Sequence, residues 1–407
     1  MSTAAASESI LAQPAEKASA REGTRLYFID HLRAALIVLV VLHHVSLVYG
    51  ASVTPFYYFE PPFTDPLAFL ALLVFALFNQ AWFMGAFFLL AGYFTPTSYD
   101  RKGAGAFLKD RLVRLGIPII LFVFVLSPIS WIGLFRMPAE ITGITTPLTW
   151  GAYPALIGLG PLWFVALLLI FSLGYVGWRL AKRAPSEAAS EDGSPPSLLS
   201  IAAFVLALAV VSYLVRIVIP LGKSVSLGVS FLSFPTFAYL PQYLGFFVLG
   251  AVASRHDWFR MVAASTGWVG FAAAVLAAVV LFPLAVSGQP FSLQITESIG
   301  NAFGYGQWQS AVYALWDSVF AVGMCLALIP FFRRFFGVST RLGRFMARQG
   351  YAVYVFHIPV IVFLALAIKG ISLPPLAKAG VASLIIVPSC FLVAYVIRKI
   401  PGASKVF

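Results

Sequence analysis

Ten apolar segments recur along this chain of 407 residues. A bilayer core about 30 Å thick is crossed by about 20 apolar residues in an α-helix, so each segment is long enough to span it. Backbone polar groups in lipid must be satisfied within the segment, which favours helices. The sequence therefore predicts an all-α polytopic membrane protein with about ten transmembrane helices. The predicted helices are residues 29–49, 67–94, 113–135, 155–179, 199–219, 236–254, 266–286, 308–332, 350–369 and 376–397.

The basic residues are distributed very unevenly over the loops between these segments. With the N-terminus on the cytoplasmic side, 21 of the 27 Lys and Arg residues fall on that side and four on the other. Loops that carry an excess of Lys and Arg stay in the cytoplasm, so this asymmetry predicts that both termini are cytoplasmic. The net charge of +12 then reflects the topology and gives no reason to expect a nucleic-acid partner.

Composition excludes two further classes. A chain that is 60% hydrophobic and 10% charged is not an ordinary soluble globular protein. Its two cysteines, Cys325 and Cys390, both lie in apolar segments, which excludes a disulfide framework or a cysteine metal cluster.

Three segments complete the predicted organisation. Residues 1–24 are small and polar, with no apolar run of signal-peptide length, and predict a disordered cytoplasmic tail. Residues 184–198 are rich in Ala, Ser, Pro and acidic residues and predict a flexible cytoplasmic linker within one membrane domain of residues 25–400. Residues 401–407 are predicted to be a second short cytoplasmic tail.

The first predicted helix contains Asp30, Arg33, His43 and His44. Ionisable side chains inside a bilayer are costly and mark functional sites. Eleven helical steps place Arg33 and His44 within about 20° of one face and about 16 Å apart, with Asp30 near the same face and His43 about 80° away. No second histidine or carboxylate lies four residues from His44 on its helix face, so the spacing does not predict a metal site. It favours proton transfer by His44, with Arg33 on the same face. The alternative is that His44 only bonds a neighbouring helix and Arg33 reaches the headgroups.

Other polar side chains fall near the middle of later helices, at a depth close to that of His44. They predict a shared polar cavity. An alternative for His357 is that its side chain satisfies a backbone carbonyl that Pro359 leaves without a hydrogen-bond donor. These residues are Asn79, Gln80, Asp317 and His357.

Basic residues also precede the third helix. Arg111 and Arg114 are three residues apart, share a helix face and could hold a phosphate-bearing cofactor, with Lys109 beside them. The positive-inside rule alone also predicts basic residues at this position.

Six motifs, in order along residues 25–400, resemble the acyltransferase 3 family of bacterial membrane enzymes and, within it, a group that acts in glucan biosynthesis. The second contains Tyr93 and the fourth contains Trp163, which we include among the predicted pore residues. The motifs are DHLRAALIVLVVLHH (30–44), WFMGAFFLLAGYF (82–94), FLKDRLVRLGIP (107–118), GPLWFVALLL (160–169), LGFFVLGAVASR (244–255) and YAVYVFHIPV (351–360).

The resemblance implies transfer of an acetyl or succinyl group from cytoplasmic acyl-coenzyme A (acyl-CoA) to a hydroxyl of a glycan beyond the bacterial inner membrane, without a metal. It implies that His44 is the catalytic base, assisted by Arg33 or Asp30, and that Arg111 and Arg114 bind the nucleotide phosphates. Direct transfer and an acyl-histidine intermediate are both open. The acceptor, the acyl group, the oligomeric state and a contribution of His43 are not determined by the sequence.

Two other functions fit the same pattern. A proton-coupled secondary transporter exporting a small acid or sugar would also use buried Asp and His, although no inverted repeat is evident. A non-catalytic scaffold for glycan assembly would tolerate substitution of His44.

Overall fold

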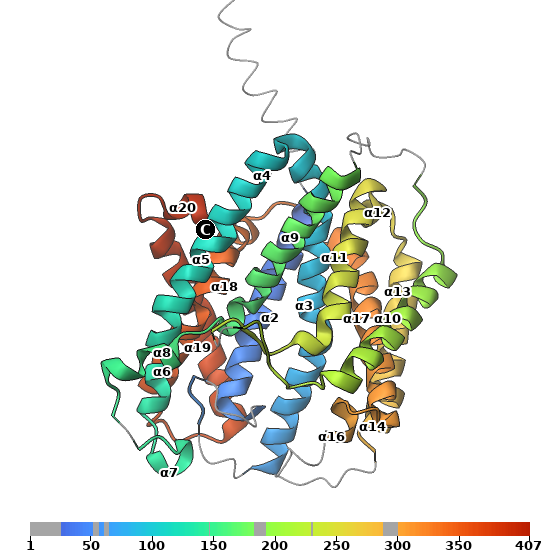
Figure 1. The fold of residues 1–407 in the computed structure, drawn as a ribbon. Helices are drawn as coiled ribbons and strands as arrows, with labels where there is room; N and C mark the ends of the chain where they lie inside the picture. The colour runs from blue at the N-terminus through green and yellow to red at the C-terminus, as the bar shows by residue number, and fades with distance from the viewer. Residues whose placement is uncertain are drawn as a thin grey trace, which may run out of the picture.

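The computed structural model describes residues 26–51, 57–60, 65–145, 147–182, 193–228, 231–287 and 300–407. Within these residues, ten helices are long and apolar enough to cross a membrane, which confirms the predicted fold class. They pack side by side as one bundle (Figure 1). The predicted tail of residues 1–24 and most of the predicted linker 184–198 lie outside the described residues.

The longer elements follow one another from α2 to α20, and two short antiparallel strands pair Val225 with Phe234. The helices are α2 (Tyr27–Ser46), α3 (Pro66–Lys102), α4 (Ala104–Arg111), α5 (Ile117–Leu121), α6 (Ser127–Phe135), α7 (Ala139–Thr142), α8 (Tyr153–Leu156), α9 (Trp163–Lys182), α10 (Leu198–Val218), α11 (Leu240–Arg255), α12 (Trp258–Met261), α13 (Ala264–Leu276), α14 (Phe282–Ala285), α16 (Gly300–Phe303), α17 (Trp308–Phe335), α18 (Arg341–Ala367), α19 (Pro375–Arg398) and α20 (Ala403–Val406). The strands and the short π- and 3-10-helical turns are β1 (Val225–Ser226), β2 (Ser233–Phe234), η1 (Leu47–Ala51), η2 (Leu112–Gly116), η3 (Phe122–Leu126), η4 (Trp150–Ala152), η5 (Gly160–Leu162), η6 (Phe237–Tyr239) and η7 (Ala277–Leu281).

Several helices are longer than their apolar segments, and α3 and α18 show this clearly. The helix α3 continues to Lys102 rather than ending near residue 94, and α18 begins at Arg341 rather than near residue 350. Capping decides the start of α18, because the Thr340 side chain accepts a hydrogen bond from the Gly343 backbone amide at 3.0 Å. Hydrophobicity marks the part of a helix that can lie in lipid, whereas the cap marks where the helix begins.

Glycines set the close contact between α3 and α11. A Cβ atom at Gly92 would clash with the Phe247 carbonyl, and one at Gly250 would clash with the Leu89 carbonyl. Small residues at such crossings let two backbones approach closely, which is how membrane helices gain packing contacts. The motif glycines therefore position the helices that flank the centre of the bundle.

The helix α2 lies inside the bundle and packs against α3, α17, α18 and α19 (Figure 1). Its residues Ile29, Leu36, Val40 and Val41 are all buried. The first helix is thus the one around which the neighbouring helices assemble.

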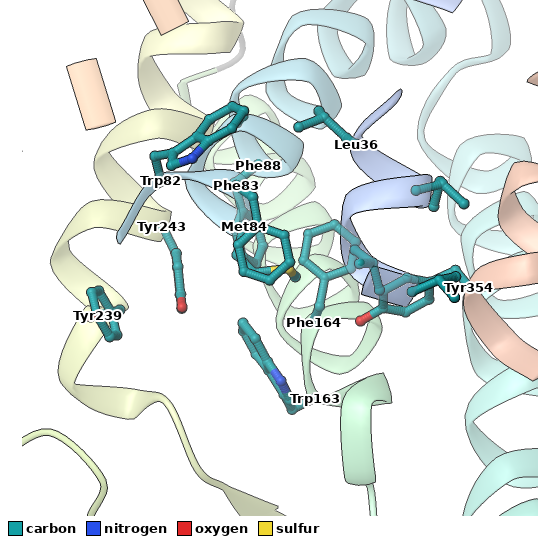
Figure 2. Packing of buried hydrophobic residues seen from close by; sticks show 14 of the residues in the cluster. Leu36, Trp82, Phe83, Met84, Phe88, Trp163, Phe164, Tyr239, Tyr243 and Tyr354 are labelled. Atoms are coloured by element: carbon teal, nitrogen blue, oxygen red, sulfur yellow. The ribbon is translucent and has the colours of Figure 1, made fainter. Parts of the chain in front are cut away.

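An aromatic row crosses the bundle beside α2. Figure 2 shows Trp163 and Phe164 of α9 between Tyr243 of α11 and Tyr354 of α18. The Trp163 and Tyr243 rings stack with centroids 5.2 Å apart, and the Phe164 and Tyr354 rings lie 5.7 Å apart. The Tyr354 hydroxyl also donates a hydrogen bond to the Pro161 carbonyl. This row connects α11 and α9 to α18, the helix that carries His357.

Candidate active site

Two histidines from different helices meet in the bundle. Nε2 of His357 on α18 lies 3.2 Å from Nδ1 of His44 on α2. Nδ1 of His44 is also 2.8 Å from the Val40 carbonyl, and Nδ1 of His357 is 2.7 Å from the Tyr354 carbonyl. The sequence predicts that His44 and His357 lie at a similar depth in the membrane, and in the structure their side chains are in direct contact.

The hydrogen-bond partners define which ring nitrogens carry protons. A carbonyl oxygen only accepts, so in neutral rings each Nδ1 is the protonated nitrogen. The His44 Nδ1–H group then donates to Val40 and is shared with Nε2 of His357. In this tautomer Nε2 of His44 carries no proton and is the basic nitrogen of the ring, which is the form a general base needs.

His43 occupies a different environment from His44. Its side chain is buried and its ring lies 5.2 Å from the Phe83 ring and 5.3 Å from the His44 ring. Among the described residues, Nδ1 of His43 has no hydrogen-bond partner. Helical phase thus separates the two neighbouring histidines as the sequence predicts.

The carbonyl bonded by His357 belongs to Tyr354. Pro359 lacks an N–H group and so leaves the carbonyl four residues earlier, that of Val355, without its helical donor. The alternative interpretation of His357, that it satisfies the freed carbonyl, is therefore not what the structure shows, because its two ring nitrogens contact the Tyr354 carbonyl and His44.

A cavity of about 560 Å³ opens at the end of the bundle where α3 ends and α2 begins, which we call the basic end. Helices α2, α3, α4, α9, α18 and α19 contribute to its wall. Seven of its charged lining residues are basic and two are acidic, so we call it the basic cavity. These residues are Asp30, Arg33, Arg101, Lys102, Asp110, Arg111, Arg114, Arg348 and Arg398.

The positive charge of the basic cavity is only partly neutralised. Lys102 and Asp110 form an ion pair at 2.9 Å. The guanidinium of Arg111 lies over the Phe107 ring at 4.8 Å, and its buried Nε has no hydrogen-bond partner among the described residues. Guanidinium groups at such a density favour a ligand with phosphate or carboxylate groups.

The basic cavity extends toward the histidine pair. Ile37 is its lining residue nearest to His44 along α2, two helical turns away, which is about 10 Å. Tyr354 is the corresponding residue on α18, and its carbonyl is the one that bonds His357. A long ligand that enters between the arginines therefore points toward His44.

The other predicted pore residues have separate partners. Gln80 donates to the Tyr243 hydroxyl at 3.1 Å, and Asn79 donates to the Leu39 carbonyl at 3.4 Å. The Tyr93 hydroxyl donates to Asp257 at 2.8 Å.

Asp317 forms an ion pair with Arg216 instead of joining the histidines. The two side chains are 2.6 Å apart, and each is only 1% exposed. The rings of Tyr239 and Tyr313 lie 4.9 and 5.7 Å from the guanidinium. This arrangement differs from the single shared polar cavity that the common depth predicts, because Asp317 pairs with a residue of α10.

Some lining residues were not predicted as site residues. On α18, Arg348, Tyr351 and Tyr354 precede His357 at steps of three and all line the basic cavity. Residues three apart are neighbours on a helix surface, so this spacing forms a row in which each residue lies next to the following one. Lys109, which was predicted as a cofactor ligand, is exposed and is not part of the lining.

Among the described residues, no group of three or more His, Cys, Asp or Glu side chains could hold a metal ion. Cys325 and Cys390 are buried and are not bonded to each other.

Comparison with known proteins adds a family and a set of relatives. Residues 26–398 match the family model described as an acyltransferase domain. Glucans biosynthesis protein C of Salmonella heidelberg, of Salmonella agona and of Salmonella dublin are each 28% identical to this chain over 245 residues. The alignments cover 57% of this chain and 59% of each relative, so the chain spans about three fifths of the length of the curated relatives it matches.

Proposed function

Since this chain belongs to the acyltransferase 3 family of membrane enzymes, we propose that it moves an acyl group from acyl-CoA in the basic cavity to a hydroxyl of a glycan on the other side of the bilayer. The observation that carries the proposal is the position of the His44–His357 pair beyond the inner end of the basic cavity. Acetyl and succinyl are the acyl groups we propose. The name of the Salmonella relatives supports a glucan as the acceptor.

The donor is proposed to enter from the basic end, which faces the cytoplasm by the positive-inside rule. The phosphates of coenzyme A would bind Arg111 and Arg114. Arg33 and Asp30, on α2, line the same cavity. The pantetheine arm is about 15 to 20 Å long, so the thioester it carries would reach the depth of His44.

Transfer then needs one base. Nε2 of His44 takes the proton of the acceptor hydroxyl as the oxygen attacks the thioester carbonyl. The carbon–sulfur bond breaks, and the coenzyme A thiolate recovers the proton from His44. Nε2 of His357 accepts the His44 Nδ1–H group, which stabilises the imidazolium that forms. Attack by Nε2 of His44 itself, giving an acyl-histidine, is the alternative route.

The role of His357 gives a first prediction. We expect His357→Phe to lower kcat about 10- to 100-fold with little change in KM for acyl-CoA. The lost hydrogen bond is present before reaction, but His44 becomes charged, and the bond stronger, only while His44 holds the proton of the acceptor. Steady-state kinetics on purified protein measures both constants. A rise in KM alone would contradict the role proposed for His357.

Donor binding gives the second prediction and tests the proposed function against a transporter of free solutes. We expect acetyl-CoA to bind the purified protein in calorimetry and Arg111→Ala to weaken that binding about 10- to 100-fold, because charge-assisted hydrogen bonds to phosphate are lost. Lys109→Ala is the matched control, since Lys109 is on the same helix but outside the cavity lining.

In this experiment, Lys109→Ala should bind acetyl-CoA as the wild type does. No binding by the wild-type protein would favour the transporter. Equal losses in both variants would show that general surface charge, rather than the basic cavity, attracts the donor.

A further inference from the structure

A second cavity, of about 350 Å³, opens at the opposite end of the bundle. It lies where α2 ends, α3 begins and α18 turns into α19. We call it the Glu60 cavity and define it by its polar lining residues, which are Tyr49, Glu60, Asp65, Lys369, Ser372 and Lys378.

The polar groups of the Glu60 cavity are held firmly. Lys378 is 6% exposed, and its Nζ donates to Glu60 at 2.5 Å and to the Lys369 carbonyl at 2.9 Å. The Tyr58 hydroxyl donates to the other Glu60 oxygen at 3.0 Å. Burial and the Glu60 carboxylate raise the pKa of Tyr58, so this hydroxyl stays protonated and keeps that bond.

One buried hydroxyl in this wall lacks a partner. Tyr49 is 3% exposed, and its hydroxyl has no hydrogen bond to any described residue. Buried hydroxyls in folded proteins are nearly always hydrogen-bonded, and an unsatisfied one calls for an explanation. A ligand with hydroxyl groups in the Glu60 cavity would supply the missing partner.

The charges of this cavity select a neutral ligand. Two acidic residues, Glu60 and Asp65, are balanced by two basic ones, Lys369 and Lys378, whereas the basic cavity has an excess of five positive charges. Apolar walls combined with a few fixed polar groups are typical of sites for neutral organic molecules, and the volume is in the usual range. Phe69 belongs to the apolar part of the wall.

The wall of the Glu60 cavity begins just beyond His44 along the axis of the first helix. Tyr49 and Gly50 follow His44 on the same helical path by five and six residues, which is about 8 Å along the axis. Gly50 has φ 147°, a conformation that favours glycine, and ends that path. The Glu60 amide donates to the Val48 carbonyl at 2.8 Å, which fixes the segment carrying Glu60 to η1, the turn that follows α2.

We propose that the Glu60 cavity binds the acceptor as a neutral saccharide and presents one of its hydroxyls to His44. This inference rests on the proposed function, because it assigns the acceptor to the side of His44 opposite the donor. Tyr49 donates to or accepts from a sugar hydroxyl, and the charge-balanced pair of Glu60 and Lys378 provides further polar contacts.

The test is binding of a neutral β-linked gluco-oligosaccharide to the full chain in nanodiscs, measured by calorimetry without acyl-CoA. We expect Tyr49→Phe to weaken binding about two- to tenfold, because one hydrogen bond to the ligand is lost. Ser372→Trp, which fills the cavity from its exposed rim, should abolish binding. Tyr305→Phe is the matched control, since Tyr305 is an exposed tyrosine outside the cavity lining.

Tyr49→Phe removes no hydrogen bond to a described residue, so a purely structural role predicts unchanged binding for it. Wild-type affinity in both Tyr49→Phe and Ser372→Trp would overturn the inference, as would tighter binding of an oligogalacturonate than of the neutral oligosaccharide. Acetyl-CoA binding is measured on the same samples. If Tyr49→Phe and Ser372→Trp bind both acetyl-CoA and the oligosaccharide as the wild type does, the acceptor site is wrong and the proposed function stands. If the wild type binds no acetyl-CoA, the proposed function itself fails.

Discussion

His44→Gln is expected to lower the rate of acyl transfer about 10²- to 10⁴-fold, the contribution typical of a general base. Glutamine is similar in size and polar, but it cannot take a proton from the acceptor hydroxyl. KM for acyl-CoA should change little, because the basic cavity is about two helical turns from His44. The measurement is transfer of labelled acetate from acetyl-CoA by purified protein, with equal amounts of folded enzyme.

His43→Gln is the matched control for this experiment. The two histidines are adjacent in sequence and both lie within α2, but His43 packs on Phe83, whereas His44 is the one that contacts His357. We expect it to retain most of the activity. Full activity in His44→Gln would refute the mechanism, and loss only in His43→Gln would transfer the role of base to His43.

Asp317→Asn is expected to destabilise the protein by about 3 to 5 kcal/mol, because it leaves the buried charge of Arg216 without its carboxylate. Both side chains are 1% exposed, so water does not replace the lost partner. Replacement of the pair together, as Arg216→Met with Asp317→Leu, should recover most of the stability, since it removes both charges. Reversible unfolding in detergent or, where that fails, the unfolding temperature measures the difference.

Asp110→Asn provides the comparison for a partly exposed ion pair. The side chains of Lys102 and Asp110 are 28% and 29% exposed, and such pairs contribute at most about 1 kcal/mol. A similar small effect of Asp317→Asn would contradict the view that the Arg216–Asp317 pair is a buried structural contact between α10 and α17.

The number of spanning helices follows from the sequence because hydrophobicity over about 20 residues is a local property. The helix ends follow less well, since α18 starts at Arg341, nine residues before the apolar segment and directly after the capping residue Thr340. The different environments of His43 and His44 were predictable as well, because both residues belong to one helix whose geometry fixes their directions.

Contacts between helices were harder to predict. Depth along each helix placed Asp317 and His357 at a common level with His44, but only His357 contacts it, while Asp317 pairs with Arg216. Depth is set within one helix, whereas the partner is set by how the helices pack around one another. Arg348 was similarly assigned to topology alone, although it converges with other arginines in the basic cavity.

The central claim is that one site joins a cytoplasmic acyl-CoA to a glycan across the membrane. It is tested most directly with proteoliposomes that hold a gluco-oligosaccharide inside and receive labelled acetyl-CoA outside. For molecules whose basic end faces outward, we predict acetylated oligosaccharide in the lumen, and none with the His44→Gln variant. Passage of free acetate or of unmodified oligosaccharide across the membrane, without any acetylated product, would contradict the account.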